Sequence, residues 1–182
     1  LRKEWDIEPH RQSMRQALLS LGHGSTAIRS HVDIDTETGL SGLEGVLQTA
    51  KTLSGQITIQ TVAFPQSGLM SRPGTLDLMQ EAMQMGADVV GGLDPCGIDA
   101  DPKGQLDAVF ALAEKHGKPI DIHLHEPGDL GAFSMEMILE RTQAHGMQGR
   151  VTISHAFCLG MPDRDRARAL VARLAEARIH IA

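Results

Sequence analysis

Short apolar runs rich in β-branched residues recur along this chain, about 30 residues apart, which is the size of a strand, a helix and the return to the next strand. Each run except the last precedes a stretch whose apolar positions follow the helical period. The runs begin at Thr26, Gln56, Ala87, Pro119, Arg150 and Arg178, and the amphipathic stretches cover 43–53, 75–85, 105–116, 135–145 and 164–177. Gly86 and Gly117 directly follow two of these stretches, at the position where a left-handed residue often ends a helix. The pattern predicts an α/β protein in which strands and helices alternate.

Strands that alternate with helices are expected to be parallel, because a strand returns in the same direction only through a crossover connection. Two architectures fit this expectation, a doubly wound sheet and a (β/α) barrel. A doubly wound nucleotide-binding sheet should carry a glycine-rich phosphate turn after its first strand. Neither Gly22-His23-Gly24 nor Gly91-Gly92 has the spacing of such a turn. We therefore favour the barrel.

The polar residues support the barrel, because barrel enzymes build their active sites at the carboxyl ends of several strands. Polar side chains stand at the ends of the expected strands, at His31, Asp33, Gln66, Asp94, 123–126 and His155. A complete TIM barrel has eight strands, and the pattern supplies six. We expect residues 1–182 to be one partial barrel domain covering about strands two to seven, with a helix before the first of them. The first residue, Leu1, and an ending inside a strand also indicate an incomplete chain.

Composition narrows the possible partners and the compartment. The net charge is −6 and the pI is near 5.8, with scattered basic residues, so no nucleic-acid partner is expected. Cys96 and Cys158 form no C-x-x-C pair, which suits a reducing compartment and predicts a cytoplasmic protein. No apolar run approaches the roughly 20 residues that cross a bilayer, so no membrane partner is expected. A homo-oligomer is compatible with the sequence.

The sharpest cluster of reactive side chains is His123-Leu124-His125-Glu126, at the end of one expected strand. Alternation along a strand points His123 and His125 the same way, and Glu126 lies just beyond, where it could swing over the mouth of the barrel. Imidazole is a common ligand for divalent transition metals, and a nearby carboxylate can move protons to and from metal-activated water. Structural hydrogen bonds to loops are the alternative explanation.

Two other positions could belong to the same site. His155 ends the next strand, and neighbouring strands lie about 4.8 Å apart, so His155 and His123 could address one ion. Gln66 follows Pro65 at the end of an earlier strand, and its amide could recognise the edge of a cyclic amide or amidine. Each could instead be an ordinary structural or loop residue.

The other polar residues near strand ends carry weaker hypotheses. Arg72 and Asp94 are less certain site residues, and the pair His31 and Asp33 could either contribute to the site or anchor a loop. The acidic segment 94–107 lacks the ligand spacing of a calcium loop and is interpreted as a solvated loop before a helix.

Several segments, taken in order, resemble the cytosine-deaminase group of the amidohydrolase superfamily. They are His31-Val32-Asp33, IQTVAFPQSGLMSRPGT, GADVVGGLDP, IDIHLHE and GRVTISHA, and the match runs from about Thr26 to the end of the chain. The ordered set is far more specific than any single segment. The resemblance implies a (β/α)₈ barrel that holds one divalent metal, zinc or iron.

The resemblance also implies roles for individual residues. His123 matches the metal ligand on the fifth strand of the barrel, and Glu126 matches the acid/base that moves a proton onto the substrate ring. His155 matches a histidine near the attacking water, and Gln66 matches a contact to the substrate amide. His125 and the leucine before it depart from the best-known members, which carry smaller or acidic residues there, so the substrate is left open.

These observations lead to three functional hypotheses. The first is a metal-dependent hydrolytic deaminase acting on cytosine or a related cyclic amidine base. The second keeps the chemistry with another cyclic substrate, such as an aminotriazine. The third is an inactive barrel fragment, because the resemblance also implies an H-x-H pair on the first strand of the barrel and an aspartate on the eighth, neither of which is expected within 1–182. Under this hypothesis the fragment alone binds metal poorly and has no activity.

Overall fold

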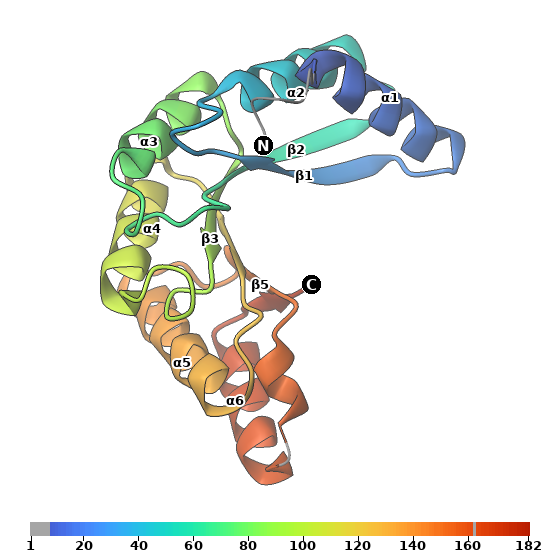
Figure 1. The fold of residues 1–182 in the computed structure, drawn as a ribbon. Coiled ribbons are helices and arrows are strands. Elements are labelled where there is room, and N and C mark those ends of the chain that lie inside the picture. Colours follow the sequence, from blue (N-terminus) through green and yellow to red (C-terminus); the bar gives the residue numbers. More distant parts are fainter. Residues whose placement is uncertain (1–7, 162) are drawn as a thin grey trace.

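The computed structural model describes residues 8–161 and 163–182, and its strands form one parallel sheet in chain order (Figure 1). The strands are β1 (Ala27–Asp33), β2 (Thr58–Phe64), β3 (Val89–Leu93), β4 (Ile120–His123), β5 (Val151–Ser154) and β6 (His180–Ile181). The helices are α1 (Pro9–Gly22), α2 (Ser41–Thr52), α3 (Thr75–Met85), α4 (Pro102–His116), α5 (Gly128–Ala144) and α6 (Arg164–Glu176), with a 3-10 turn η2 (Phe157–Gly160). The predicted alternation of strand and helix is confirmed.

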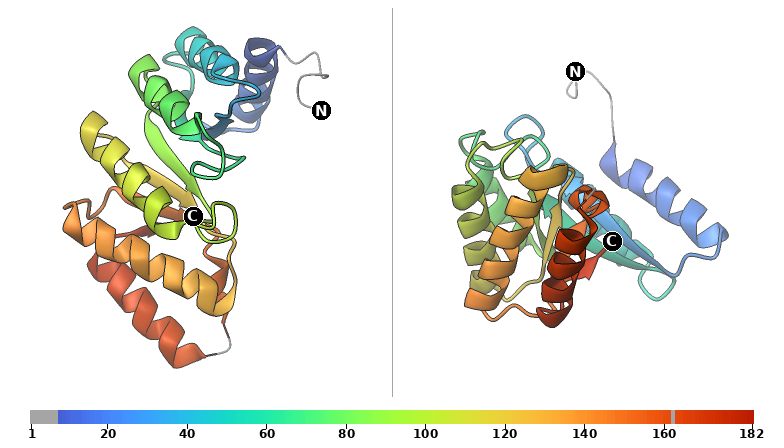
Figure 2. Two further views of the ribbon diagram at one scale, coloured as in Figure 1. Left: turned by 60° about the vertical axis from the view of Figure 1, so that its left-hand side comes forward. Right: turned by 90° about the horizontal axis from the view of Figure 1, so that it is seen from below.

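The sheet is curled into a half-barrel, with the helices α3 to α6 arranged along its convex side (Figures 1 and 2). Each strand pairs in parallel with the next one along the chain. The longest pairing joins β1 to β2, from Ala27 opposite Thr58 to Asp33 opposite Phe64. The prediction of an incomplete (β/α) barrel is therefore confirmed, and all carboxyl ends of the strands lie at one rim.

The main core lies between the strands and the helices on the convex side. The fully buried side chains there include Met79 from α3, Phe110 from α4 and Ile138 from α5. A smaller apolar cluster combines Val62, Phe64, Val89 and Leu93 from β2 and β3. Gly91 of β3 lies beside it, and a Cβ at this position would stand 2.5 Å from the carbonyl oxygen of Ala63. Only glycine therefore allows these two strands to approach so closely.

Two helices begin three or more residues earlier than predicted, because glycine and proline conceal their first turns in the sequence. The helix α4 begins at Pro102 rather than Gln105, with the Asp101 carboxylate accepting a hydrogen bond of 2.8 Å from the amide of Gly104. The helix α5 begins at Gly128 rather than Met135. The poor helix propensity of glycine within this first part of α5 conceals its start in the sequence.

The acidic loop between β3 and α4 is not solvated throughout, so that prediction is wrong for Asp99. Its side chain is buried, and its carboxylate accepts hydrogen bonds from the amides of Leu69 and Ser71 at 2.9 and 3.1 Å. The Gln105 amide adds a third at 2.8 Å. Burial raises the pKa of Asp99, but these hydrogen bonds outweigh it and leave the pKa below its usual value. Asp99 thus ties the loop after β2 to the loop after β3.

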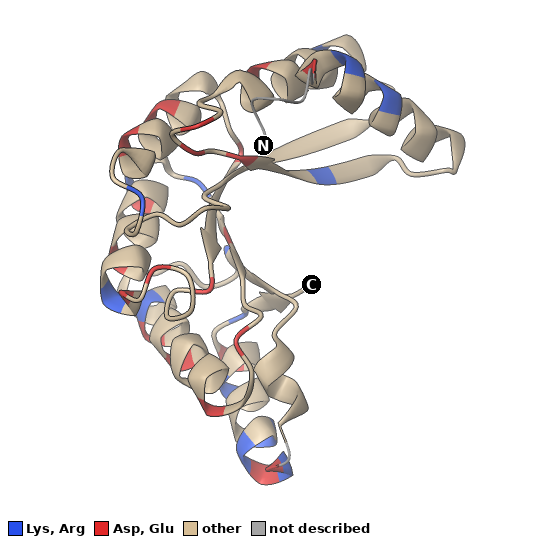
Figure 3. Cartoon of the chain, in the orientation of Figure 1, with Lys and Arg blue, Asp and Glu red and all other residues tan. Residues whose placement is uncertain are grey.

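Charged residues of both signs are interspersed over the helices, without a continuous basic stripe in the view of Figure 3. Among the described residues, no helix combines the length and the apolar character needed to cross a membrane. Neither observation identifies a partner.

Candidate active site

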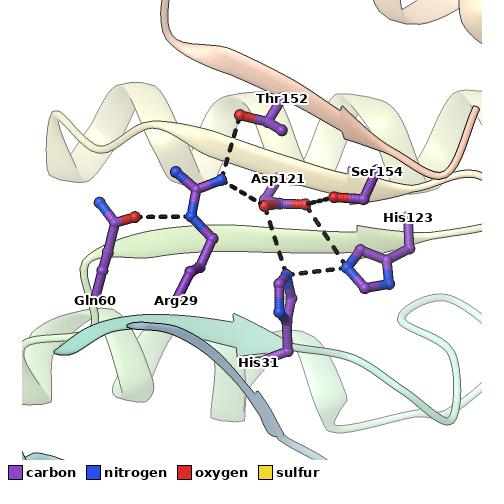
Figure 4. A network of polar contacts seen from close by, with 7 residues as sticks. All are labelled: Arg29, His31, Gln60, Asp121, His123, Thr152 and Ser154. Carbon is purple, nitrogen blue, oxygen red and sulfur yellow. Dashed lines mark hydrogen bonds and ion pairs between the residues drawn. The ribbon is translucent and has the colours of Figure 1, made fainter. Parts of the chain in front are cut away.

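His123 is the last residue of β4, and its position there is fixed by both neighbouring strands. It pairs in register with Leu93 of β3 and with Ser154 of β5. Its side chain is 17% exposed, and its Nε2 atom lies 3.0 Å from Nε2 of His31 on β1 (Figure 4). His31 is therefore brought into contact with His123.

A buried carboxylate, Asp121, lies close to both histidines (Figure 4). It accepts hydrogen bonds of 2.7 Å from Nη1 of Arg29 and 2.9 Å from the hydroxyl of Ser154. Nε2 of His31 lies 3.5 Å from its Oδ2 atom. Burial raises the pKa of Asp121, but the hydrogen bonds from His31, Arg29 and Ser154 together hold it below its usual value. Asp121 is therefore an anion in contact with three donors.

Arg29 extends this network to two further side chains on the concave face. Its Nε donates to Oε1 of Gln60 on β2 at 2.8 Å, and its Nη1 lies 3.4 Å from the hydroxyl of Thr152 on β5 (Figure 4). The network therefore joins strands β1, β2, β4 and β5 below the rim where His123 stands.

The pKa of His123 is lowered from its usual value to about 4. Burial is the largest cause, followed by the nearby His31, and only Asp121 acts in the opposite direction. His123 is therefore neutral at neutral pH. A neutral imidazole has a lone pair free for a metal ion, so this environment suits a metal ligand.

Three imidazoles gather at the ends of β4 and β5. The ring centroids of His123 and His155 are 4.8 Å apart, and His125 stacks on His155 with centroids 4.5 Å apart. The predicted adjacency of His123 and His155 is confirmed. His155 and Ala156 have φ values of 72° and 47°, so a left-handed turn directs the chain away from β5 at this point. Such backbone conformations are costly for non-glycine residues and cluster at functional sites.

Asp94, directly after β3, makes two contacts with His125. Its Oδ1 accepts a hydrogen bond of 2.6 Å from the amide of His125, and its Oδ2 lies 2.8 Å from Nδ1 of the same ring. The φ of Asp94 is 35°, again in the left-handed region. The side chain of Asp94 thus contacts the cluster through His125, and its backbone amide donates to the carbonyl of His123 at 3.0 Å.

Glu126 is fixed in place rather than free to swing, which differs from the sequence prediction. The side chain is 5% exposed, and Oε1 accepts hydrogen bonds from the amides of Cys96 and Gly97 at 2.8 and 2.7 Å. Its Oε2 accepts a further hydrogen bond from the hydroxyl of Ser134 on α5. The loop after β3 and the helix α5 therefore set the direction of this carboxylate.

Gln66 stands apart from this cluster. Its side chain is exposed after the end of β2, and its backbone amide donates to the carbonyl of Phe64 at 3.0 Å. Within the described part of the chain, no hydrogen bond joins its side chain to the histidines. Arg72 is likewise exposed, in the loop that follows.

Asp121 and Arg29 were missed by the sequence reasoning, although a signal for them exists. The alternation that points His123 inward also points Asp121 inward, two residues earlier on the same strand. Arg29 precedes His31 by the same interval on β1. A charged residue at an inward position of a barrel strand is unusual and could have been marked for this reason.

Metal-binding side chains converge in two overlapping groups within the described residues. One contains His123, His125 and His155, and the other contains His31, Asp121 and His123. In each group the potential ligand atoms lie within 4.8 Å of one another. Imidazole and carboxylate groups suit zinc, iron and manganese alike, so the donor set fits a divalent transition metal without selecting one.

The chain is similar in sequence to known proteins of one family. A sequence model of the amidohydrolase family matches residues 12–182. N-isopropylammelide isopropyl amidohydrolase of Pseudomonas sp. strain ADP is 36% identical over 151 residues, covering 83% of this chain and 38% of that protein. The chain spans 38% to 40% of the length of the curated relatives it matches.

The chain is also similar in fold and sequence to solved structures. N-isopropylammelide isopropylaminohydrolase from Burkholderia multivorans matches with a TM-score of 0.96 and 49% identity, covering 99% of this chain and 46% of that one. 5-Methylcytosine deaminase from Klebsiella pneumoniae, liganded with 5-fluorocytosine, matches with a TM-score of 0.84 and 30% identity, covering 97% and 43%.

Proposed function

The chain belongs to the amidohydrolase family, and from this premise we propose that it supplies one side of the active site of a metal-dependent hydrolase acting on a cyclic amidine or amide base. The observation that carries the proposal is the convergence of His123 and His155 at the carboxyl ends of β4 and β5, with Glu126 three residues after His123 in the chain. In a (β/α) barrel this rim is where the reaction takes place. Residues 1–182 are then one part of a single barrel domain.

In the proposed reaction, water replaces an amine on a ring carbon. A C–O bond forms, the bond from carbon to the exocyclic nitrogen breaks, and the products are a cyclic amide and ammonia or an alkylamine. A bound divalent metal, zinc or iron, would supply a hydroxide nucleophile from water at neutral pH. His123 would hold this metal through its neutral imidazole.

The other residues would handle protons and substrate. Glu126 would take a proton from the attacking water and pass it to the ring nitrogen, and would then move the second proton of that water to the leaving amine. His155 would orient the attacking water from the next strand. Gln66, exposed at the same rim, would contact the amide edge of the substrate.

Two substrate classes are proposed. Cytosine or a close analogue is supported by the match to 5-methylcytosine deaminase at 30% identity. An N-substituted aminotriazine is supported by the matches to the two isopropylammelide hydrolases at 36% and 49% identity. The higher sequence identity to the isopropylammelide hydrolases favours the aminotriazine. His125, which replaces a smaller or acidic residue of the best-known cytosine deaminases, is consistent with a substrate other than cytosine. A cytoplasmic location is proposed from the two free cysteines, Cys96 and Cys158.

The test is release of ammonia or alkylamine from cytosine, isocytosine, ammelide, N-isopropylammelide and a pterin, using the whole protein that contains these residues, loaded with Zn²⁺ or Fe²⁺. At least one substrate should be hydrolysed, and Glu126→Gln should slow it by about 10² to 10⁴-fold. His23→Ala, exposed at the end of α1, is the matched control and should not change the rate. No release from any substrate, or an unaffected Glu126→Gln variant, contradicts the proposal.

A further inference from the structure

The two carboxylate oxygens of Glu126 meet different kinds of partner. Oε1 accepts hydrogen bonds from the backbone amides of Cys96 and Gly97 at 2.8 and 2.7 Å. Oε2 accepts a hydrogen bond from the hydroxyl of Ser134 on α5. A carboxylate oxygen has about two lone-pair directions, so Oε1 is fully occupied and Oε2 keeps one direction open. The open direction of Oε2 is therefore where a proton can arrive and leave.

The hydroxyl of Ser134 differs from the two amides because it can change direction. A backbone amide is held by the chain and can only donate, whereas a hydroxyl rotates and can both donate and accept. The thiol sulfur of Cys96 also lies within reach of the Ser134 oxygen, at 3.4 Å. The hydrogen of the Ser134 hydroxyl can therefore point either to Oε2 of Glu126 or to this sulfur.

Burial gives weight to the choice between these two directions. The side chain of Ser134 is fully buried and Glu126 is 5% exposed, so neither can exchange its partner for bulk water. A buried polar group without a partner is costly. While Glu126 is an anion, Oε2 is the stronger acceptor for the hydroxyl. Once Oε2 carries a proton its strength as an acceptor falls, and the sulfur offers the hydroxyl another acceptor.

The packing of α5 places Ser134 beside the carboxylate. Gly131 precedes Ser134 by three residues and lies on the same side of the helix. A Cβ at Gly131 would stand 2.0 Å from the carbonyl oxygen of Glu126. The lack of a side chain at Gly131 thus lets α5 approach the main chain of Glu126 closely, and this approach brings the Ser134 hydroxyl to Oε2.

We propose that Ser134 is a positioning residue for the reaction, whose hydroxyl donates to Oε2 while Glu126 is an anion and turns to the sulfur of Cys96 while Glu126 is protonated. The inference rests on the proposed function, because it takes Glu126 as the acid/base. The proton that Oε2 gains comes from the attacking water and goes on to the ring nitrogen. No proton is transferred to Ser134 or to Cys96, and only the direction of hydrogen bonds changes between them.

The kinetic test uses the whole protein that contains these residues, with the cyclic substrate that it hydrolyses fastest. Ser134→Ala should lower kcat by about 10 to 100-fold with KM nearly unchanged, because a hydrogen bond to a charged acceptor is lost. Ser134→Thr keeps the hydroxyl and should retain most of kcat. Cys96→Ala should lower kcat by only about 2 to 5-fold, because sulfur is a weak acceptor.

Thr142→Ala is the matched control. Thr142 is buried on the same helix, its hydroxyl donates to the carbonyl of Ile138 at 2.8 Å, and its loss should not change kcat. A merely structural Ser134 gives a different pattern, in which the kcat of every variant follows its thermal stability and Ser134→Thr loses as much activity as Ser134→Ala. That pattern overturns the proposal. Circular dichroism establishes that each variant is folded.

The spectroscopic test needs neither substrate nor metal. The infrared difference between wild type and Glu126→Gln isolates the carboxylate band of Glu126, and Ser134→Ala should shift this band because one donor is lost. A protein that hydrolyses a cyclic base but shows no shift overturns only this inference. A protein that shows the shift but hydrolyses no cyclic base overturns the proposed function and, with it, the part of Ser134 in the reaction.

Discussion

Asp121 on β4 accepts a hydrogen bond of 2.7 Å from the guanidinium of Arg29 on β1, a residue 92 positions earlier in the chain. The two strands are separated by β2 and β3 in the sheet. The pair therefore crosses the concave face and is made only when the sheet is curled. It links the curvature of the half-barrel to the carboxylate beneath His31 and His123.

Asp121→Asn should destabilise the fold, because it leaves Arg29 without its anionic partner inside the barrel. Breaking a buried ion pair typically costs 3–5 kcal/mol, and the partial exposure of Arg29 reduces this to about 2–3 kcal/mol. Urea unfolding measures the loss. Asp165→Asn, which removes an exposed ion pair with Arg168 on α6, is the matched control and should change little. Equal effects of the two substitutions would show that the Asp121–Arg29 pair contributes nothing specific.

Asp99→Asn should lower stability at neutral pH by about 1.5–3 kcal/mol, because the charged acceptor of hydrogen bonds from Leu69, Ser71 and Gln105 is lost. The pKa of Asp99 is lower in the folded protein than its ordinary value of 3.8. Its contribution to stability is therefore complete above that value and is lost as the pH falls through the folded pKa. Unfolding free energies measured from pH 7 down to pH 2 should show the difference between wild type and variant shrink at the acid end. A difference that is constant with pH would refute this account.

The metal-free chain should become less stable as the pH falls from about 6.5 to 4, because His123 resists protonation in the folded state. Its pKa is lowered from 6.5 to about 4 in the folded state, so in this interval the unfolded chain binds the proton and the folded chain does not. At about 1.4 kcal/mol per pKa unit, the loss is on the order of 3 kcal/mol. Nuclear magnetic resonance of the imidazole in metal-free protein should give a titration midpoint near 4. A midpoint at the ordinary value would remove the reason for regarding this side chain as a ready ligand.

Gly131→Ala should disturb Glu126, since a Cβ at this position in α5 would lie 2.0 Å from the carbonyl oxygen of Glu126. The clash should destabilise the protein by about 1–3 kcal/mol and displace the carboxylate held by Cys96 and Gly97. The matched control is Gly22→Ala at the end of α1, where a Cβ would meet nothing within 4 Å. This control should be neutral or slightly stabilising, as replacing glycine in a helix usually is. Thermal unfolding of both variants measures these changes in stability. An unchanged stability of Gly131→Ala would contradict the close packing of Gly131 against Glu126.

Much of the fold could be predicted from the sequence, because strand and helix periods differ and recur along the chain. The strand end at His123 and the adjacency of His123 and His155 are predicted correctly, whereas the strand before His155 ends one residue earlier than predicted, at Ser154. The start of α5 was not predicted, because Gly128 adopts a left-handed backbone (φ 54°) and Gly131 packs closely against the carbonyl of Glu126, and neither follows helix propensity.

The site was predictable only in outline. Sequence reasoning identified reactive side chains at strand ends, but it could not show which carboxylates are held by contacts between distant segments. Asp99 was interpreted as solvated, although Leu69 and Ser71 from the preceding unit bury it. The fixed direction of Glu126 depends in the same way on amides from the loop after β3. Contacts between segments about 30 residues apart leave no local pattern in the chain.

The most direct test of the central claim is a crystal structure of the zinc-loaded chain with anomalous diffraction measured at the zinc edge. The account predicts an anomalous peak at the carboxyl ends of β4 and β5, within about 2.1 Å of an imidazole nitrogen of His123. A peak bound elsewhere, or a fully loaded crystal in which His123 has no metal contact, would contradict it.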